Sequence, residues 1–81
     1  MKVSVDISLY PIKNEYQQPI LDFIQELKTS EFKVIENNLS TQIYGDYDKV
    51  MPFLNSKIKE VFFDENLYVF VLKIVKGDRS E

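Results

Sequence analysis

The first part of the chain alternates strictly between apolar and polar side chains, from residue 3 to residue 10. A period of two is the pattern of a β-strand that buries one face and leaves the other open. The apolar side consists of Val3, Val5, Ile7 and Leu9, and the polar side of Ser4, Asp6, Ser8 and Tyr10. We therefore expect a first strand that packs on one side only and that ends at Pro11.

Two later segments repeat their apolar residues at intervals of three and four, which is the spacing of an amphipathic helix. The first lies within residues 14–30, and the second begins near Asp46 or Asp48, either of which can cap a helix. The apolar stripes are Ile20, Phe23, Ile24 and Leu27 in the first, and Val50, Phe53, Leu54, Ile58 and Val61 in the second. We expect both stripes, together with Phe62, to form the core.

Three shorter segments, residues 32–36, 39–45 and 67–75, have the length and composition of further strands. Asn37 and Asn38 separate the first two of them. Because Asn tolerates a positive φ better than other non-glycine residues, these two are expected to act first as turn residues in a tight hairpin.

The predicted element order is βαββαβ, which indicates an α+β ferredoxin-like sandwich. In this topology a four-stranded antiparallel sheet has the order 4-1-3-2, and both helices lie on one face. Residues 1–76 are expected to form this single domain, since 81 residues have room for one core. Residues 77–81 contain nothing to bury, and we expect them to be a disordered tail.

The predicted fold leaves one face of the sheet uncovered. The polar side of the first strand would lie on that face, next to Ser40, Gln42 and Tyr44 of the third strand. The last strand is apolar on both sides, with Phe70, Leu72 and Ile74 on one and Val69, Val71 and Val75 on the other. Because an exposed apolar strand face favours association, we expect the chain to form a dimer or tetramer through its open face.

Composition excludes several classes of function. The chain has no Cys and no His, which removes thiol nucleophiles, imidazole bases, disulfides and the usual zinc ligands. Its net charge of −3 and its single arginine, Arg79, argue against a nucleic-acid surface. We see no signal peptide and no membrane span, so a cytoplasmic location is the default expectation.

The third predicted strand has polar residues at three consecutive positions, Ser40, Thr41 and Gln42. Hydroxyls and an amide at positions where strands usually carry apolar side chains offer hydrogen-bonding groups instead of packing. This pattern suggests that the strand contacts a polar small molecule.

Three segments together resemble the YkoF-like family of small thiamine-binding domains. These segments are Ile7-Ser8-Leu9-Tyr10-Pro11, Ser40-Thr41-Gln42-Ile43-Tyr44-Gly45-Asp46-Tyr47-Asp48 and Val69-Phe70-Val71-Leu72-Lys73. The resemblance implies a protein without catalytic activity or cofactor that binds thiamine or its hydroxymethylpyrimidine half, in thiamine salvage or uptake. It also implies that a chain with one domain assembles with further copies of itself.

An aminopyrimidine presents a ring nitrogen acceptor beside an amino donor, and it offers a flat face for stacking on an aromatic ring. The candidate ligand-binding residues are Asp6, Ser8, Tyr10, Asn38, Ser40, Thr41, Gln42 and Tyr44. Two alternatives stay open for this set. The hydroxyls and Gln42 can instead bond across a subunit interface, and Asp6 can pair with Lys73 rather than complement a cationic ligand.

Two functions remain after these exclusions. The first is a binding protein for thiamine or its pyrimidine, and the second is an ACT-like regulatory or assembly module that uses the open face for association or for another metabolite. An acylphosphatase would need an arginine early in the chain, an RNA-recognition domain would need aromatic and basic strands, and a metal chaperone would need Cys. None of these requirements is met.

Overall fold

The computed structural model describes residues 1–12, 18–63, 65 and 67–80. The helices and strands are, in order, β1 (Lys2–Pro11), α1 (Gln18–Lys28), β2 (Lys33–Glu36), β3 (Thr41–Asp46), α2 (Tyr47–Phe62) and β4 (Tyr68–Lys76). Residues 13–17, where the start of the first helix was expected, lie outside the described part. The predicted element order is confirmed, although Leu39 and Ser40 precede β3 rather than belong to it.

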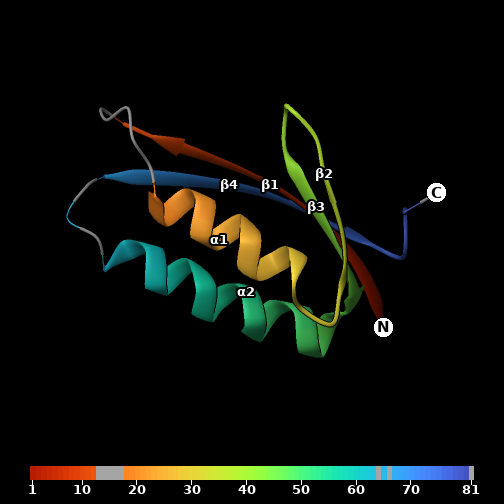
Figure 1. Cartoon of the computed structure of the whole chain (residues 1–81). Helices are drawn as coiled ribbons and strands as arrows, with labels where there is room; N and C mark the ends of the chain where they lie inside the picture. Colours follow the sequence, from red (N-terminus) through yellow and green to blue (C-terminus); the bar gives the residue numbers. More distant parts are fainter. Residues whose placement is uncertain (13–17, 64, 66, 81) are drawn as a thin grey trace.

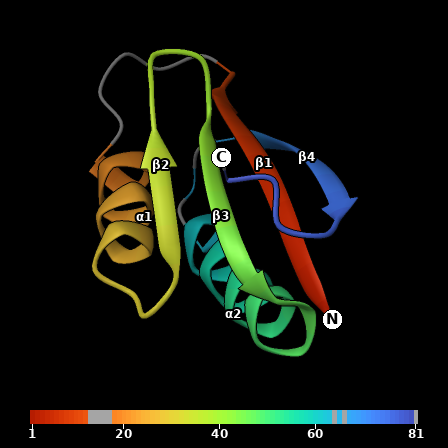
Figure 2. The same cartoon turned by 90° about the vertical axis from the view of Figure 1, so that its right-hand side faces the viewer.

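The four strands form one sheet with the order β2-β3-β1-β4, and every neighbouring pair is antiparallel. Both helices lie on one face of this sheet, and the other face has no helix (Figures 1 and 2). The predicted α+β ferredoxin-like fold is therefore confirmed, including the strand order 4-1-3-2.

The core lies between β1, β3 and the two helices. Its buried apolar residues are Val3, Val5, Ile7, Phe23, Leu27, Ile43, Val50, Leu54, Val61 and Tyr68. Phe53 is half-buried against this set, whereas Phe62 is 55% exposed. The prediction that Phe62 belongs to the core is wrong, because Phe62 is the last residue of α2 and touches only the edge of the core through the ring of Phe70, 5.5 Å away.

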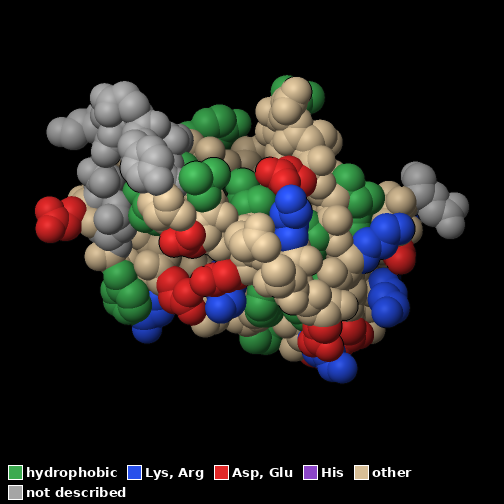
Figure 3. All heavy atoms as spheres, in the orientation of Figure 1, with side chains coloured by type: hydrophobic (Ala, Val, Ile, Leu, Met, Phe, Trp, Pro, Cys, Tyr) green, Lys and Arg blue, Asp and Glu red, His purple; other side chains and the backbone are tan. Residues whose placement is uncertain are grey.

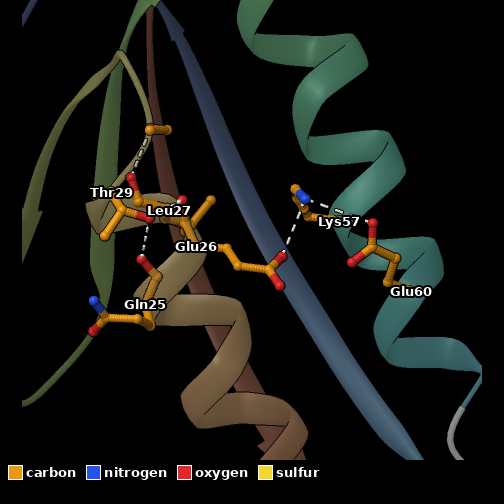
Figure 4. Close-up of polar contacts among 7 residues, drawn as sticks. Gln25, Glu26, Leu27, Thr29, Lys57 and Glu60 are labelled. Carbon is orange, nitrogen blue, oxygen red and sulfur yellow. Dashed lines mark hydrogen bonds and ion pairs between the residues drawn. The ribbon is translucent and has the colours of Figure 1, made fainter.

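The two helices are tied together by an ion pair. Lys57 of α2 lies 3.2 Å from the carboxylate of Glu26 in α1 and 3.5 Å from that of Glu60 in its own helix (Figure 4). The bond to Glu26 is the main cause that raises the pKa of Lys57. Elsewhere on this face acidic and basic side chains are intermixed (Figure 3), so the helices present no surface of a single charge there.

The hairpin between β2 and β3 turns through Asn37, but by a different means from the one predicted. The side-chain oxygen of Asn37 accepts hydrogen bonds from the backbone N–H groups of Leu39 and Ser40, at 2.9 and 3.0 Å. No non-glycine residue in the described part of the chain has a positive φ. Asn37 thus stabilises the turn with its side chain, as Asn commonly does in Asx-turns, and not by a left-handed backbone.

The start of α2 also differs from the prediction that Asp46 or Asp48 caps this helix with its side chain. Asp46 occupies the N-cap position, yet its side chain makes no capping hydrogen bond. Its carboxylate instead lies 3.0 Å from the amino group of Met1, which lowers the pKa of Asp46.

The residues that follow β4 lie against the open face of the sheet. Gly77 has a φ of +99°, and there the chain leaves β4 and crosses β1 on the side away from the helices (Figure 2). The Ser4 hydroxyl donates to the carbonyl of Gly77 at 2.7 Å and accepts from the N–H of Arg79 at 2.8 Å. Ser4 is only 6% exposed, so these two bonds hold residues 77–79 against the open face. We call residues 77–80 the C-terminal segment.

None of the helices in the described residues is long and apolar enough to cross a membrane.

A substitution at Gly45 should test the packing between the sheet and α2. A Cβ at this position would lie 2.8 Å from Cδ1 of Phe32 and 2.9 Å from Cγ2 of Val50. We expect Gly45→Ala to lower the free energy of unfolding by about 1–3 kcal/mol through overpacking. Chemical denaturation measures this value, with the exposed Asn55→Ala in α2 as control, for which a change within about 0.5 kcal/mol is expected. Equal stability of the two variants would contradict the close packing.

The attachment of the C-terminal segment should depend on Ser4. Ser4→Ala removes one acceptor and one donor, so we expect the amide of Arg79 to exchange with solvent about tenfold faster. Hydrogen exchange followed by NMR measures this rate. Ser8→Ala is the matched control, because Ser8 lies on the same side of β1 and its side chain makes no hydrogen bond in the described structure. Unchanged exchange at Arg79 in Ser4→Ala would show that other contacts hold the segment.

Candidate functional site

The open face of the sheet carries a hollow with a volume of ≈ 230 Å³. Its lining residues come from β1, β3, β4 and the C-terminal segment: Ser4, Val5, Asp6, Gln42, Tyr44, Lys73, Val75 and Arg79. We call it the open-face hollow. The strand register explains this gathering, because Asp6 of β1 pairs with Gln42 of β3 on one side and with Lys73 of β4 on the other. Three predicted site residues, Asp6, Gln42 and Tyr44, therefore share it.

The carboxylate of Asp6 accepts hydrogen bonds from Ser40, which directly precedes β3, and from Gln42 in β3. The Ser40 hydroxyl donates to Oδ1 of Asp6 at 2.6 Å, and Nε2 of Gln42 donates to the same oxygen at 2.8 Å. Gln42 also donates to the hydroxyl oxygen of Ser40 at 2.6 Å. In the described structure all these bonds use Oδ1, so Oδ2 of Asp6 remains available to accept a hydrogen bond from a ligand.

These hydrogen bonds keep Asp6 ionised. The bonds from Ser40 and then Gln42 lower the pKa of Asp6 below the 3.8 of a free aspartate. Burial opposes this effect, and the charge of Lys73 makes a smaller contribution that lowers the pKa. Lys73 acts here from a distance, since no ion pair joins it to Asp6 in the described structure. Of the two alternatives left open for Asp6, a direct ion pair with Lys73 is not formed in the described structure, where Ser40 and Gln42 bond the carboxylate instead.

Four other predicted site residues line a second, smaller hollow of about 150 Å³, which we call the hairpin hollow. It lies between the end of β1, helix α1 and the β2–β3 turn. The predicted residues in its wall are Ser8, Asn38, Ser40 and Thr41. Ser40 connects the two hollows, because it lines this one while its hydroxyl bonds Asp6 in the other.

Thr41 and Tyr10 do not line the open-face hollow with Asp6. Thr41 pairs with Ile7 and is 6% exposed, so it lies on the side of the sheet that the helices cover. Tyr10 lies toward the end of β1 opposite Val69, is 53% exposed, and lines neither hollow. Seven of the eight predicted residues therefore divide between the two hollows, and Tyr10 lies in neither.

Sequence reasoning missed Ser4 and Arg79 as residues of the open-face hollow. Ser4 was predicted to face this side, but the sequence pattern does not distinguish it from Ser8, the other serine of the strand. Arg79 gave no signal at all, because it follows the last strand in a polar segment. Only the turn at Gly77 and the bonds to Ser4 bring it over the sheet.

A further groove of ≈ 250 Å³ lies between the helices and contains Glu26, Lys57 and Glu60 in its wall. Its polar side chains already satisfy one another through the ion pairs of Lys57 (Figure 4). Within the described residues no group of three or more carboxylates is arranged to hold a metal ion. The ion pair between Lys57 and Glu26 in this groove joins the two helices.

Solved structures with the same fold come from several organisms. A protein from Streptococcus pneumoniae superposes with a TM-score of 0.85 at 21% identity, covering 98% of this chain and 90% of its own. A hypothetical protein from Methanocaldococcus jannaschii reaches 0.77 at 24% identity, covering 99% of this chain and 84% of its own. These similarities show the fold.

A third solved structure has a name that refers to thiamine. It is a protein from Thermotoga maritima that its name assigns provisionally to thiamine biosynthesis or salvage. Its TM-score is 0.80 at 19% identity, and the match covers 95% of this chain and 85% of that one. No curated protein matches the sequence.

The sequence itself identifies the family. The model of the YkoF-related family matches residues 2–75, which include every strand and helix described above except the last residue of β4. The predicted family resemblance is confirmed, and the chain belongs to the YkoF-related family.

Proposed function

We propose that this chain is a non-catalytic binding protein for thiamine or its hydroxymethylpyrimidine moiety, that it acts in thiamine salvage or transport in the cytoplasm, and that the open-face hollow is its site. The observation that carries the proposal is the Asp6 carboxylate, fixed by Ser40 and Gln42 beside the ring of Tyr44. Membership of the YkoF-related family and the name of the Thermotoga maritima structure support the same ligand class.

The chemistry of the hollow fits an aminopyrimidine. Oδ2 of Asp6 can accept a hydrogen bond from the exocyclic amino group of the pyrimidine. The face of the Tyr44 ring can stack on the heterocycle or lie against the positive charge of a thiazolium ring. Because the pKa of Asp6 is lowered, its carboxylate is ionised and an acceptor at neutral pH.

The size of the hollow limits what it can hold. Sites for drug-sized ligands usually measure about 300–1,000 Å³, and this one measures ≈ 230 Å³. One heterocycle fits this space, and the second ring of thiamine would extend along the open face. A second copy of the chain is the group best placed to cover that ring, which agrees with the predicted assembly into a dimer or tetramer.

Titration with thiamine and with hydroxymethylpyrimidine tests this proposal. We expect both to bind the wild-type chain, and Asp6→Asn to weaken binding about tenfold or more, because a hydrogen bond to a charged group contributes about 1.5–3 kcal/mol. Gln42→Ala should weaken it as well, since Asp6 then loses a partner that positions it. Isothermal calorimetry gives the affinities, and a rise of the unfolding midpoint with ligand confirms binding to the folded state.

The matched control is Asn38→Ala, which changes the hairpin hollow only. We expect its affinity to equal that of the wild type. If Asn38→Ala weakens binding and Asp6→Asn does not, the ligand occupies the hairpin hollow. If neither compound binds the wild type, the proposed function is wrong.

A second candidate function is an ACT-like assembly or regulatory module, and one observation favours it. On the open face β4 presents Val69 and Val71, which are 39% and 54% exposed, next to Tyr10. This apolar strip lies toward the end of the sheet opposite the C-terminal segment and lines neither hollow. Apolar strand surface of this kind is typical of a face that another chain covers.

Val71→Asp tests the strip without touching the open-face hollow. A buried unpaired carboxylate at a subunit contact costs several kcal/mol, so we expect the variant to be monomeric under conditions in which the wild type is oligomeric. Native mass spectrometry measures the subunit count, and Val71→Thr is the control of similar size without charge. If Val71→Asp dissociates the assembly and neither compound binds the wild type, the assembly module is the better description. An unchanged subunit count would exclude the strip as the contact.

A further inference from the structure

Two cationic side chains without an ionic partner line the open-face hollow. Lys73 projects from β4 and Arg79 from the C-terminal segment. In the described structure neither has a carboxylate oxygen within 4.0 Å, in contrast to Lys28 and Lys57, which are both paired. The hollow therefore contains two unpaired positive charges.

The negative charge in the hollow offsets only part of the positive charge of Lys73 and Arg79. Asp6 is the one acidic residue in the wall, and its hydrogen bonds to Ser40 and Gln42 direct Oδ1 toward β3 rather than toward Lys73 in β4. Asp78 lies next to Arg79 in the chain, but it is not part of the wall, and its carboxylate accepts from the N–H of Ser80 at 2.9 Å. The wall thus keeps an excess of one positive charge.

The position of Arg79 is determined by the fold. The left-handed backbone at Gly77 turns the chain onto the open face, and Ser4 then holds the carbonyl of Gly77 and the N–H of Arg79. The guanidinium folds back over Gly77, with Nε and Nη2 each 3.8 Å from the point that a Cβ of Gly77 would occupy. The backbone of Arg79 is thus fixed at the rim of the hollow by the buried Ser4, and its guanidinium donors have no partner among the described residues. Such an arrangement is suited to binding an anion.

We propose that the open-face hollow prefers a phosphorylated ligand, with Lys73 and Arg79 binding the phosphate of an aminopyrimidine phosphate monoester. The inference rests on the proposed function, since Asp6 and Tyr44 would hold the heterocycle. Unphosphorylated hydroxymethylpyrimidine is uncharged at neutral pH, so it leaves the excess positive charge of the wall without a counter-charge. A phosphate monoester carries nearly two negative charges at neutral pH, and it can accept hydrogen bonds from the guanidinium and the ammonium together.

The test compares hydroxymethylpyrimidine with its phosphate monoester on the full chain, by calorimetry at low salt. We expect the phosphate ester to bind about tenfold more tightly than hydroxymethylpyrimidine to the wild type, because two partly exposed charge pairs contribute about that factor together. The ratio of the two dissociation constants should fall to about 1 in the double variant Lys73→Gln, Arg79→Gln. It should also fall as salt rises, since salt screens exposed charges.

The matched control is Lys49→Gln with Lys59→Gln, which removes the same charge from exposed positions of α2 in the helix layer. This control should keep the tenfold ratio. Inorganic phosphate provides a separate readout, and it should raise the unfolding midpoint of the wild type and of the α2 variant, but not of the variant that lacks Lys73 and Arg79.

Each result decides between the two proposals. If hydroxymethylpyrimidine binds as tightly as its phosphate ester, or if the α2 variant loses the ratio too, the preference for phosphate is wrong while the binding function stands. If inorganic phosphate stabilises the protein through Lys73 and Arg79 but neither hydroxymethylpyrimidine nor its phosphate ester binds, the anion site stands and the proposed function is wrong. If none of the three compounds binds, both are wrong.

Discussion

The structure depends on one constraint, the burial of one side of β1 under the two helices. Val3, Val5 and Ile7 are each at most 2% exposed, and β1 lies between β3 and β4 in the sheet. Since successive side chains of a strand point to opposite faces, burying these three places Ser4 and Asp6 on the open side. A shift of one residue in the register would exchange the two sides, and the loss of core packing prevents such a shift.

The same constraint brings together groups that lie far apart in the sequence. Asp6, Gln42 and Lys73 meet because the register of β1 with its two neighbours aligns them on one face. The hydrogen bonds that Ser40 and Gln42 donate to Asp6 then lower its pKa, so that the carboxylate is charged at neutral pH in spite of its partial burial. The packing of the core and the charge of the candidate site thus have the same origin.

Sequence patterns predicted the fold well because each element has a strong periodic signal. The alternation in β1, the helical stripes and the polar third strand were sufficient for the element order and the strand order. They failed where a residue's surroundings come from distant parts of the chain. Phe62 continues a helical stripe, but α2 ends there and leaves it exposed.

The candidate site was predicted only in part for the same reason. Alternation placed Asp6, Gln42 and Tyr44 on one face correctly, and it also implies that Thr41 lies on the opposite face. No local pattern indicates that Ser4 holds the C-terminal segment, because the two bonds join positions more than 70 residues apart. The part of the site that Arg79 contributes could be found only from three-dimensional structure.

The turn at Gly77 has a practical consequence for work on this protein. With the backbone at a φ of +99° and residues 77–79 bonded to Ser4, the chain after β4 runs over the open face instead of away from the sheet. An affinity tag or a fused domain joined after this segment would start beside the open-face hollow and could obstruct it. Recombinant protein is therefore best cleaved of such additions before binding to this hollow is measured.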